Sequence, residues 1–420
     1  MESKSPKAPA SLSGRRGLIC EIDRFASRIY TKNKGVKMKN IRSLLLFLIV
    51  LTAFFAFLEA DGQELLADLY RMGKIRLVPE IALDDDSMPE DVFFHNPMAI
   101  SCDKEGNVYI LDYKANDIKK FDSYGKFIKI IGRRGQGPGE FNMPFLMTFA
   151  RDRLVIWDMM NLRFCGLTPN GDYIESVNFP FEAGWPRKLK SLPNGSILIE
   201  LEKRDRSDLN APQECILDLY SSDFKYKKTI YSHHVLRNKY VRKPRSVNIP
   251  QPYTPLVYWD VSPDGKVIIG FSEKYEIEIH GSDKGKISSF THPYESVKVT
   301  EEDKKAHFAG MTFSVDGVRQ KTPDFIIEKT EFPKFKPAFW NIMVDSEGNI
   351  LVFTHRKNRE EMFRYFDAFS SEGNFIAHVQ VVGDVPFPAT RSATFIGRTI
   401  WTLGQGEDEL IKAIKYKISN

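Results

Sequence analysis

The chain has 420 residues and a mass of 48.3 kDa, with 42% hydrophobic and 27% charged residues. This composition is that of a globular protein and excludes a disordered or low-complexity chain. The formal net charge is +5, but residues 1–42 contain 11 Lys and Arg against 3 Asp and Glu. The rest of the chain therefore has a net charge of −3, so a basic surface is not indicated and no nucleic-acid partner is expected.

One strongly apolar segment lies near the N-terminus, at residues 43–58. It has 16 uncharged residues, fewer than the roughly 20 that span a bilayer comfortably. Lys39 and Arg42 precede it, and the small residue Ala60 follows it. A start at Met38 would give the basic, apolar and small-residue order of a secretory signal peptide. The segment is therefore predicted to be a signal peptide, or a transmembrane anchor if it is not cleaved.

This leader divides the chain into four predicted parts. Residues 1–37 are a basic leader that is not translated if synthesis starts at Met38, and residues 38–60 are the signal peptide or anchor. Residues 61–73 are predicted to be a tether with a short helix, outside the folded domain at residues 74–420. We expect this domain to be exported across the cytoplasmic membrane and to be periplasmic, or membrane-anchored with the domain outside the cytoplasm.

The chain has four cysteines: Cys20, Cys102, Cys165 and Cys215. They form no Cys-x-x-Cys pair and have no regular spacing, which disfavours a disulfide framework and a cysteine-ligated zinc site. The cysteines of the folded domain are expected to be small buried thiols within strands.

Beyond residue 73 the chain repeats short β-rich runs separated by turn residues. The clearest unit has strands over residues 97–101, 108–112, 118–122 and 126–131. Four antiparallel strands in about 40 residues are typical of one blade of a β-propeller.

The same pattern of strand, turn and strand recurs six times. The turn glycine or its equivalent falls at residues 106, 152, 195, 265, 348 and 397. Long gaps between copies predict insertions at about 201–214, 231–256 and 291–335. The last copy lacks a strand, and the strand-like residues 74–83 are predicted to complete it and close the ring. The predicted fold is all-β, a six-bladed β-propeller preceded by an N-terminal hydrophobic helix.

A glycine-rich segment follows the first unit. It reads Gly-Arg-Arg-Gly-Gln-Gly-Pro-Gly-Glu-Phe-Asn-Met-Pro over residues 132–144. With the preceding blade, residues 96–144 resemble an NHL repeat. Later segments between residues 332 and 375 resemble bacterial exported six-bladed β-propeller proteins with NHL-type repeats. The resemblance covers residues 74–420. It implies the fold, and for function no more than a scaffold that binds ligands.

The glycine-rich segment is not predicted to bind phosphate. It lacks the Gly-Lys-Ser/Thr ending of a phosphate loop, and no helix follows that could hold an anion at its N-terminus. No metalloprotease or serine-hydrolase motif occurs in the chain. His233 and His234 are adjacent, so on a strand they would face opposite ways, and they are expected to be loop residues.

Three tryptophans are candidate ligand-binding residues. Trp185, Trp259 and Trp340 stand at even offsets before a turn glycine, so in regular strands they would share one sheet face. They predict either packing between blades or an aromatic platform for a glycan or peptide at the channel mouth. The cationic partners of such a platform would be Arg187, Arg133 and Arg134.

An alternative is a metal in the central channel. Propeller hydrolases and lyases hold such a metal with side chains at the ends of inner strands, and Asn96, Asp260 and Asn341 stand near such ends. Asn and acidic residues are also common turn formers, so the pattern is weak. No cofactor is predicted, and a divalent channel metal stays open as the alternative.

The sequence therefore predicts a non-catalytic extracytoplasmic binding module for a peptide, glycan or protein partner. The alternative is a propeller hydrolase or lyase with a channel metal. A third possibility is a structural protein whose insertion at 231–256, with its basic run from Arg237 to Arg245, docks a partner.

Overall fold

The computed structural model describes residues 65–241, 247–309, 312–315, 318–355, 364–385, 387–388, 393–405 and 411–420. The chain divides into two units, residues 1–64 and residues 65–420. The basic leader and the apolar segment at 43–58 lie outside the described residues. Within the described ranges, no helix has the length and apolar character needed to cross a membrane.

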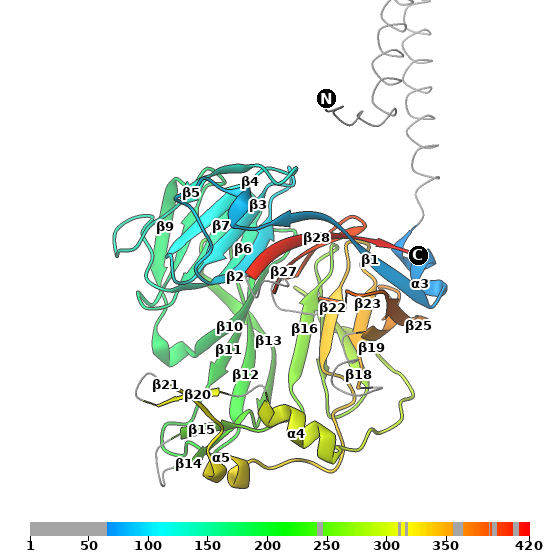
Figure 1. Ribbon diagram of the computed structural model, residues 1–420. Coiled ribbons are helices and arrows are strands. Elements are labelled where there is room, and N and C mark those ends of the chain that lie inside the picture. The colour runs from blue at the N-terminus through cyan, green and yellow to red at the C-terminus, as the bar shows by residue number, and fades with distance from the viewer. Residues whose placement is uncertain are drawn as a thin grey trace, which may run out of the picture. The chain divides into compact units, whose positions relative to one another are not determined.

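The second unit is built from six four-stranded antiparallel groups, blades A to F (Figure 1). Blade A contains β2 (Pro97–Cys102), β3 (Val108–Asp112), β4 (Asp117–Phe121) and β5 (Phe127–Ile131), and blade B contains β6 (Pro144–Ala150), β7 (Arg153–Asp158), β8 (Arg163–Leu167) and β9 (Tyr173–Asn178). Blade C contains β10 (Trp185–Ser191), β11 (Ile197–Lys203), β12 (Gln213–Tyr220) and β13 (Tyr226–Val235), and blade D contains β16 (Val257–Val261), β17 (Lys266–Phe271), β18 (Glu276–Gly281) and β19 (Gly285–Thr291). Blade E contains β22 (Asn341–Val344), β23 (Ile350–Phe353), β24 (Tyr365–Phe369) and β25 (Phe375–Val382), and blade F contains β26 (Thr394–Ile396), β27 (Thr399–Gln405), β28 (Ile411–Ser419) and β1 (Lys74–Leu83).

The position of a strand in its blade follows from its burial pattern. All five residues of β3 are buried, as are all five of β4, because the middle strands lie between two neighbouring blades. The outer strands β5 and β9 are largely exposed. Continuous apolar runs therefore mark the second strands of the blades, such as residues 154–157 and 350–353.

The hydrophobic core is a ring of clusters between blades. Six buried clusters occur in the described residues, and each joins two neighbouring blades around the circle from A to F and back to A. Trp157 fills the cluster between blades B and C, Trp259 the one between C and D, and Trp401 the one between F and A. The blades are therefore stabilised chiefly by contact with their neighbours.

All six predicted turns connect the first and second strands of a blade. Gly106 and Gly265 have φ of 82° and 85°, a conformation that a residue with a Cβ rarely adopts. In blade B the left-handed residue is Arg151, with φ of 57°, rather than the expected Asp152. The six predicted turns are therefore confirmed, and in blade B the left-handed residue lies one position before the predicted one.

The ring closes through β1. Seven residue pairs join β1 to β28 in antiparallel register, from Arg76–Ser419 to Leu83–Ala413. The first residues of β1 also pair in parallel with β25, so that blades E and F form one eight-stranded sheet. The strand predicted at residues 74–83 is thus present and is the outer strand of the last blade.

The predicted tether was wrong for its described part. Helix α3 (Leu66–Arg71) belongs to the folded unit, because Leu66, Leu69 and Tyr70 are fully buried in the cluster between blades E and F. The Tyr70 ring contacts the Phe366 ring edge-on at 5.5 Å. The Leu66 N–H donates to the Glu347 carboxylate at 2.9 Å.

The long insertions lie at one end of the blades. Because the strands alternate in direction, the turns from first to second strand meet at one end, called here the turn end. The loops from second to third strand and from blade to blade meet at the other, the insertion end. The elements in these insertions are β14 (Asn238–Val241), β15 (Val247–Pro250), α4 (Glu301–Ala309), β20 (Thr312–Val315), β21 (Val318–Lys321) and α5 (Asp324–Lys329). Figure 1 shows them together beyond the ends of β11 and β12.

Polar contacts connect these insertions into one layer, the insertion layer, formed by the described residues of 204–212, 236–256 and 292–340. The Tyr240 N–H donates to Asn210 Oδ1 at 2.7 Å. The Glu331 N–H donates to Gln251 Oε1 at 3.1 Å. Two short 3₁₀ helices, η1 (Asp85–Ser87) and η2 (Phe181–Ala183), complete the described elements.

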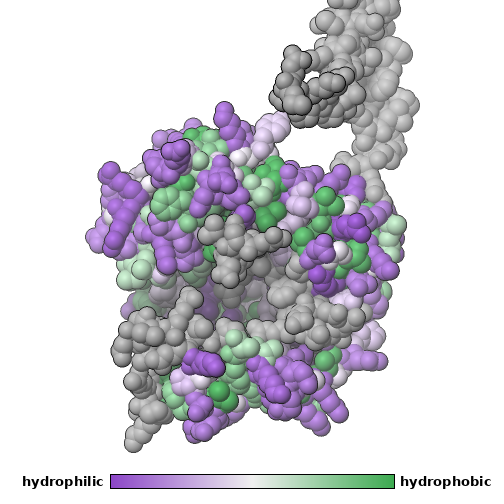
Figure 2. All heavy atoms as spheres, viewed as in Figure 1, coloured by the Kyte–Doolittle hydropathy of each residue, from purple (hydrophilic) through white to green (hydrophobic). Residues whose placement is uncertain are grey.

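A buried ion pair lies inside the insertion layer. Lys336 Nζ contacts Asp303 Oδ1 at 2.7 Å, and both side chains are almost fully buried. The Lys336 ammonium also lies over the Tyr253 ring, 5.3 Å from its centroid. The layer thus has its own polar core, while its outer surface is largely hydrophilic, like most of the face seen in Figure 2.

Candidate functional site

A cavity of about 300 Å³ lies in the central channel between three inner strands. It is lined by three consecutive residues from each of β2, β6 and β10: Met98, Ala99, Ile100, Phe145, Leu146, Met147, Arg187, Lys188 and Leu189. These residues are the second to fourth of β2 and of β6 and the third to fifth of β10. The cavity therefore lies beside the middle of the inner strands.

The two sides of this cavity differ in chemistry. Blades A and B contribute only apolar side chains, among them Met98, Phe145 and Met147. Blade C contributes Arg187 and Lys188. An apolar lining beside two basic residues suits a ligand that has both an apolar group and a negative charge.

Arg187 belongs to a cluster of arginines around one buried carboxylate. Arg204 Nε contacts Glu202 Oε1 at 2.8 Å, and the Nε atoms of Arg187 and Arg237 each lie 3.6 Å from Glu202 Oε2. Arg237 also contacts Glu200 Oε1 at 2.8 Å. Glu202 is the cross-strand partner of Trp185, at the insertion end of blade C.

The lysines of β10 extend this network to blade D. Lys188 Nζ donates to the Trp259 carbonyl and lies 4.4 Å from the Trp259 ring centroid. Lys190 Nζ contacts Asp260 Oδ1 at 2.6 Å, and Asp260 Oδ2 accepts the Val344 N–H at 3.0 Å. Burial alone would raise the pKa of Asp260, but the two lysines and the Val344 amide hold it below its ordinary value.

The network contains an excess of positive charge. Its cations are Arg187, Lys188, Lys190, Arg204 and Arg237, and its anions are Glu200, Glu202 and Asp260. Among these eight side chains the net charge is +2. Buried or half-buried charge of one sign favours binding of the opposite charge, because the protein interior screens it less than water does.

The three predicted tryptophans do not form one platform. Trp185 packs edge-on against Trp157, with ring centroids 6.3 Å apart, at the interface of blades B and C. Trp259 is 1% exposed, and its Nε1–H donates to Glu200 at 2.9 Å. Trp340 packs on Phe353 at the interface of blades E and F. A register shift between residues 186 and 188 breaks the regular alternation on which the shared-face prediction depended.

The predicted cationic partners lie in two different places. Arg187 lines the channel cavity, whereas Arg133 and Arg134 do not. The Arg133 guanidinium contacts the Glu140 carboxylate at 2.8 Å within the glycine-rich loop. Residue 134 forms an isolated β-bridge with Phe141, which folds the loop onto itself.

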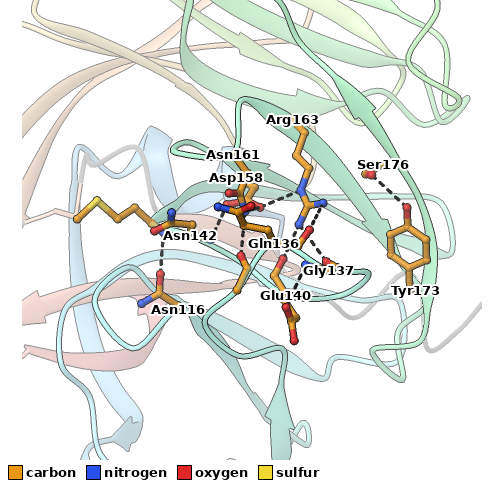
Figure 3. A network of polar contacts seen from close by, with 12 residues as sticks. Asn116, Gln136, Gly137, Glu140, Asn142, Asp158, Asn161, Arg163, Tyr173 and Ser176 are labelled. Carbon is orange, nitrogen blue, oxygen red and sulfur yellow. Dashed lines mark hydrogen bonds and ion pairs between the residues drawn. The ribbon is translucent and has the colours of Figure 1, made fainter.

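The glycine-rich loop is organised around a cation, not an anion (Figure 3). Arg163 donates to the carbonyl oxygens of Gln136, Gly137 and Glu140 at 2.8–3.1 Å. The Gly137 N–H donates to Glu140 Oε2 at 2.9 Å, which with Arg133 lowers the pKa of that carboxyl. This arrangement turns three carbonyl oxygens of the loop toward Arg163.

A carboxylate at the end of the second strand fixes the chain entering the blade. Asp158 accepts the Asn142 N–H at 2.7 Å and pairs with Arg163 Nε at 3.0 Å (Figure 3). In blade A, Asp112 accepts the N–H groups of His95 and Asn96 at 2.7 and 3.0 Å. These carboxylates therefore have an architectural role at the start of β2 and β6.

The predicted channel-metal residues are not assembled into one site by the contacts described. Asn96 precedes blade A, which adjoins neither blade D, where Asp260 lies, nor blade E, where Asn341 lies. Asp260 is held by Lys190 and by the Val344 amide. Asn341 Oδ1 accepts the N–H of the next residue at 2.9 Å.

Several residues of the described chain were not singled out from the sequence. Lys188, Met98 and Phe145 line the cavity. For Lys188 the only local signal was the alternation of cations in Trp-Pro-Arg-Lys-Leu-Lys at residues 185–190, and Met98 and Phe145 had none. His233 and His234 lie on β13 rather than in a loop, and His234 is exposed. Cys165 and Cys215 are buried free thiols as expected, and Cys102 is half-buried.

A second cavity, of about 220 Å³, lies at the turn end between blades A and B. Its lining includes Asp103, Glu105, Lys120 and Asp152, so acidic and basic groups alternate around it. Lys104 Nζ pairs there with Asp152 at 2.9 Å. The charges compensate one another, and the channel cavity remains the stronger candidate.

Comparison with known proteins supports the fold. A family described as "6-bladed beta-propeller" matches residues 89–272, from the segment before blade A to the second strand of blade D. The chain has the six-bladed propeller fold. The match does not distinguish NHL-type repeats, so that part of the resemblance stays a prediction. No curated protein matches the chain.

Solved structures give only distant likenesses. A protein from Bacteroides fragilis, provisionally described as exported, has 12% identity and a TM-score of 0.47, and the match covers 82% of this chain and 96% of that one. A member of the duf4221 family from Bacteroides vulgatus has 12% identity and a TM-score of 0.47, with 83% and 99% covered. Virginiamycin B lyase from Staphylococcus aureus has 12% identity and a TM-score of 0.40, with 82% and 99% covered. We infer no activity from them.

Proposed function

We propose that this propeller is a non-catalytic binding module whose central channel takes the free C-terminal end of an apolar peptide. The observation that carries the proposal is the two-sided cavity, with an apolar wall from β2 and β6 and two cations from β10. A peptide end offers a carboxylate next to an apolar side chain. Arginine suits carboxylates because its planar fork can donate two parallel hydrogen bonds.

The peptide is favoured over the glycan that the tryptophans suggested. Sugar rings stack on an open aromatic face, and Trp259 has no such face because it is 1% exposed. The aromatic residue in the cavity is Phe145, which stands among methionine and leucine side chains. Such a lining favours an aliphatic or aromatic side chain over a polyhydroxylated ligand.

The compartment of this ligand follows from the sequence of the leader. The charged, apolar and small-residue order around residues 38–60 supports export across the cytoplasmic membrane. The ligand would then be a peptide, or the end of a protein, outside the cytoplasm. N-terminal sequencing of the native protein tests this part: a mature end near residues 57–61, or a membrane-bound chain, is expected. A full-length soluble chain in the cytoplasm would contradict it.

The enzyme alternative has less support in the channel. Asp260, the one acidic residue predicted as a channel ligand, is engaged by Lys190 and by a backbone amide. The cavity lining contains no carboxylate, imidazole or thiol. The cavity offers cations and apolar groups, which suit binding rather than metal-assisted hydrolysis.

The test uses two forms of one probe, a fluorescently labelled Ala-Phe-Leu peptide with a free C-terminal carboxylate or with a C-terminal amide. Polarisation should show binding of the free acid, and binding of the amide should be about 10-fold weaker or more, because a charged hydrogen bond is lost. Arg187→Met should weaken binding of the acid by a similar factor. Lys129→Met, on the exposed outer strand of blade A, is the matched control. Equal affinities for acid and amide, or an effect of Lys129→Met as large as that of Arg187→Met, would refute the proposal.

A further inference from the structure

Two histidines and an aspartate meet where the end of blade D contacts the third and fourth strands of blade E. His292 directly follows β19, Asp367 lies on β24, and His378 lies on β25. Each of them has a possible ligand atom, and these atoms all lie within 4.8 Å of one another. Among the described residues, no other group of three His, Cys, Asp or Glu side chains comes as close.

The carboxylate of this group is buried and oriented. The Asp367 side chain is 1% exposed, and its Oδ1 lies 2.6 Å from His378 Nδ1. Its Oδ2 accepts the Tyr275 hydroxyl at 2.7 Å. Asp367 and His378 are direct cross-strand partners in the antiparallel pair of β24 and β25, so the backbone register itself places them together.

The imidazole from blade D is held by ring contacts. His292 stacks on Phe375 with ring centroids 4.5 Å apart and an angle of 23° between the planes. It also lies 5.6 Å from the His378 ring. The His292 N–H donates to the Tyr275 carbonyl at 3.3 Å, which fixes the backbone from which the side chain projects.

We propose that His292, Asp367 and His378 bind a divalent transition-metal ion of the zinc class. Two imidazoles and one carboxylate are a ligand set that zinc uses when its fourth position is open, whereas calcium and magnesium prefer oxygen ligands only. In a tetrahedral zinc site neighbouring ligand atoms lie about 3.3 Å apart. Asp367 Oδ1 and His378 Nδ1 are 2.6 Å apart and must separate modestly if both bind the ion, whereas ligand atoms farther apart than this must approach. His378 can move because half of its side chain is exposed.

The surrounding groups have the roles expected around such a metal. The Tyr275 hydroxyl holds one oxygen of the carboxylate and thereby orients the other. The exposure of His378 gives an entry path from solvent, and the open fourth position would be taken by water or by a group of a partner. The site lies on the third and fourth strands of blade E and just after the fourth strand of blade D, away from the inner strands that line the cavity, and is therefore independent of the function proposed for the channel.

The position of the site gives the metal a structural consequence. His292 is the first residue after the last strand of blade D, where the insertion of residues 292–340 begins, and the other two ligands belong to blade E. A bound metal would join these two blades at the root of the insertion. Since a metal that binds only the folded protein stabilises it by mass action, zinc should raise the melting temperature.

The experiment measures zinc binding directly by calorimetry on the full chain after treatment with a chelator. We expect one zinc ion per chain, a rise in melting temperature, and replacement of zinc by Co²⁺ with a visible absorption band. His292→Ala and His378→Ala should each weaken zinc binding at least 10-fold. His234→Ala removes an exposed histidine from β13 and is the matched control.

Each outcome decides the proposal. Loss of zinc binding in both ligand variants, with His234→Ala unchanged, supports it. No zinc binding to the wild-type chain, or equal weakening by all three variants, overturns it. Circular dichroism and melting without metal show whether a variant has lost its fold. In that case His378→Asn, a smaller change at an exposed position, must still weaken zinc binding for the proposal to stand. Binding of the Ala-Phe-Leu probe should not depend on zinc, so this site and the channel site can fail separately.

Discussion

Blades A and B differ from blades C, D and E in what connects their strands, although all five have the same four-stranded sheet. At the insertion end, blades A and B have connections that pack onto themselves, such as the glycine-rich loop around Arg163. Blades C, D and E have the insertions that form the insertion layer. The channel cavity lies where the two kinds of blade meet.

The difference is also one of charge. In blades A and B the carboxylate that ends the second strand, Asp112 or Asp158, fixes backbone N–H groups and pairs with a cation of its own blade. In blade C the corresponding place is taken by Glu202, which is surrounded by three arginines. The carboxylates of blades A and B are thus each paired within their own blade, whereas Glu202 of blade C is surrounded by more cations than it can neutralise. Blades A and B, which have no long insertions, thus form the apolar part of the cavity lining. Blade C, which has an insertion, contributes the basic residues proposed to bind the ligand.

The largest expected effect on thermal stability comes from deleting an element of the blades rather than an insertion. Deleting residues 65–83 removes α3 and β1, and with them the buried side chains of Leu66, Leu69, Tyr70 and Ile75. At about 1.5–3 kcal/mol for each of these four side chains, the lost burial is comparable to a typical free energy of unfolding of about 5–15 kcal/mol. We therefore expect no cooperative thermal transition. Replacing residues 301–329 by a short glycine–serine linker should leave the transition present. Calorimetric melting of the two variants makes the comparison, and loss of folding in both would show that the insertions are part of the scaffold.

The next largest effect compares a buried lysine of blade A with a partly exposed arginine of blade C. Lys119 is 2% exposed and pairs with Asp112 at 3.1 Å and Asp117 at 2.8 Å. Lys119→Met would leave two carboxylates without their cation, and should lower the free energy of unfolding by about 3–5 kcal/mol. Arg187→Met should cost about 1 kcal/mol or less, since Arg187 is partly exposed and Glu202 keeps two other arginines. Urea unfolding measures both. If both variants lost a similar free energy of unfolding, the cations of blades A and C would not differ in their contribution to the fold.

A smaller effect follows from the pH dependence of His355, which follows β23 and contacts Tyr253 of the insertion layer. Burial and the nearby Lys336 lower the pKa of His355 from 6.5 to about 4, while Asp303 acts in the opposite direction. Because the unfolded chain binds the proton at a higher pH, the contribution of His355 to stability is fully present above about pH 6.5 and is lost as the pH falls toward 4. Between pH 6.5 and 5 this group alone should cost about 2 kcal/mol. His355→Gln should remove that part of the slope in urea unfolding. His95→Gln, at an exposed position beside blade A, should not, and an unchanged slope in His355→Gln would contradict the assignment.

The smallest effect compares equivalent turns. Arg151 has φ of 57° where other blades have glycine, so Arg151→Gly should stabilise the protein by up to about 1 kcal/mol. Gly265→Ala, at φ of 85° in blade D, should destabilise it by about 1 kcal/mol. Melting temperatures of the two variants should therefore move in opposite directions. A shift of the same sign in both would mean that side-chain contacts, not backbone conformation, dominate at these turns.

The fold could be predicted further than the site, for a physical reason. Strands and turn glycines are local patterns, and the position of β1 followed from counting strands. The short helix expected within residues 61–73 is present as α3, but it was placed outside the folded domain, because so short a helix does not reveal that its Leu66, Leu69 and Tyr70 are buried against the blades.

The site depends on contacts that no local pattern contains. Arg187 was found because it stands next to a tryptophan, but Met98 and Phe145 come from other blades. The orientation of Trp185 could not be predicted because offsets along the chain do not reveal the register shift between residues 186 and 188. The group around Asp367 joins residues from two blades, and only the hairpin of β24 and β25 brings two of them together.

The pairing of β1 with β28 also sets the order of events during synthesis. Leu77 pairs with Ile418, about 340 residues later in the chain, so the ring cannot close until the last residues have been made. Contacts of such long range form slowly, because a long loop must be ordered first. During this delay β1 exposes its backbone edges, and its outward-facing Lys74, Arg76 and Glu80 together with Pro79 disfavour pairing with other chains. Under the proposed export, the ring would thus stay open, and the chain able to cross the membrane unfolded, until residues 411–419 have been made.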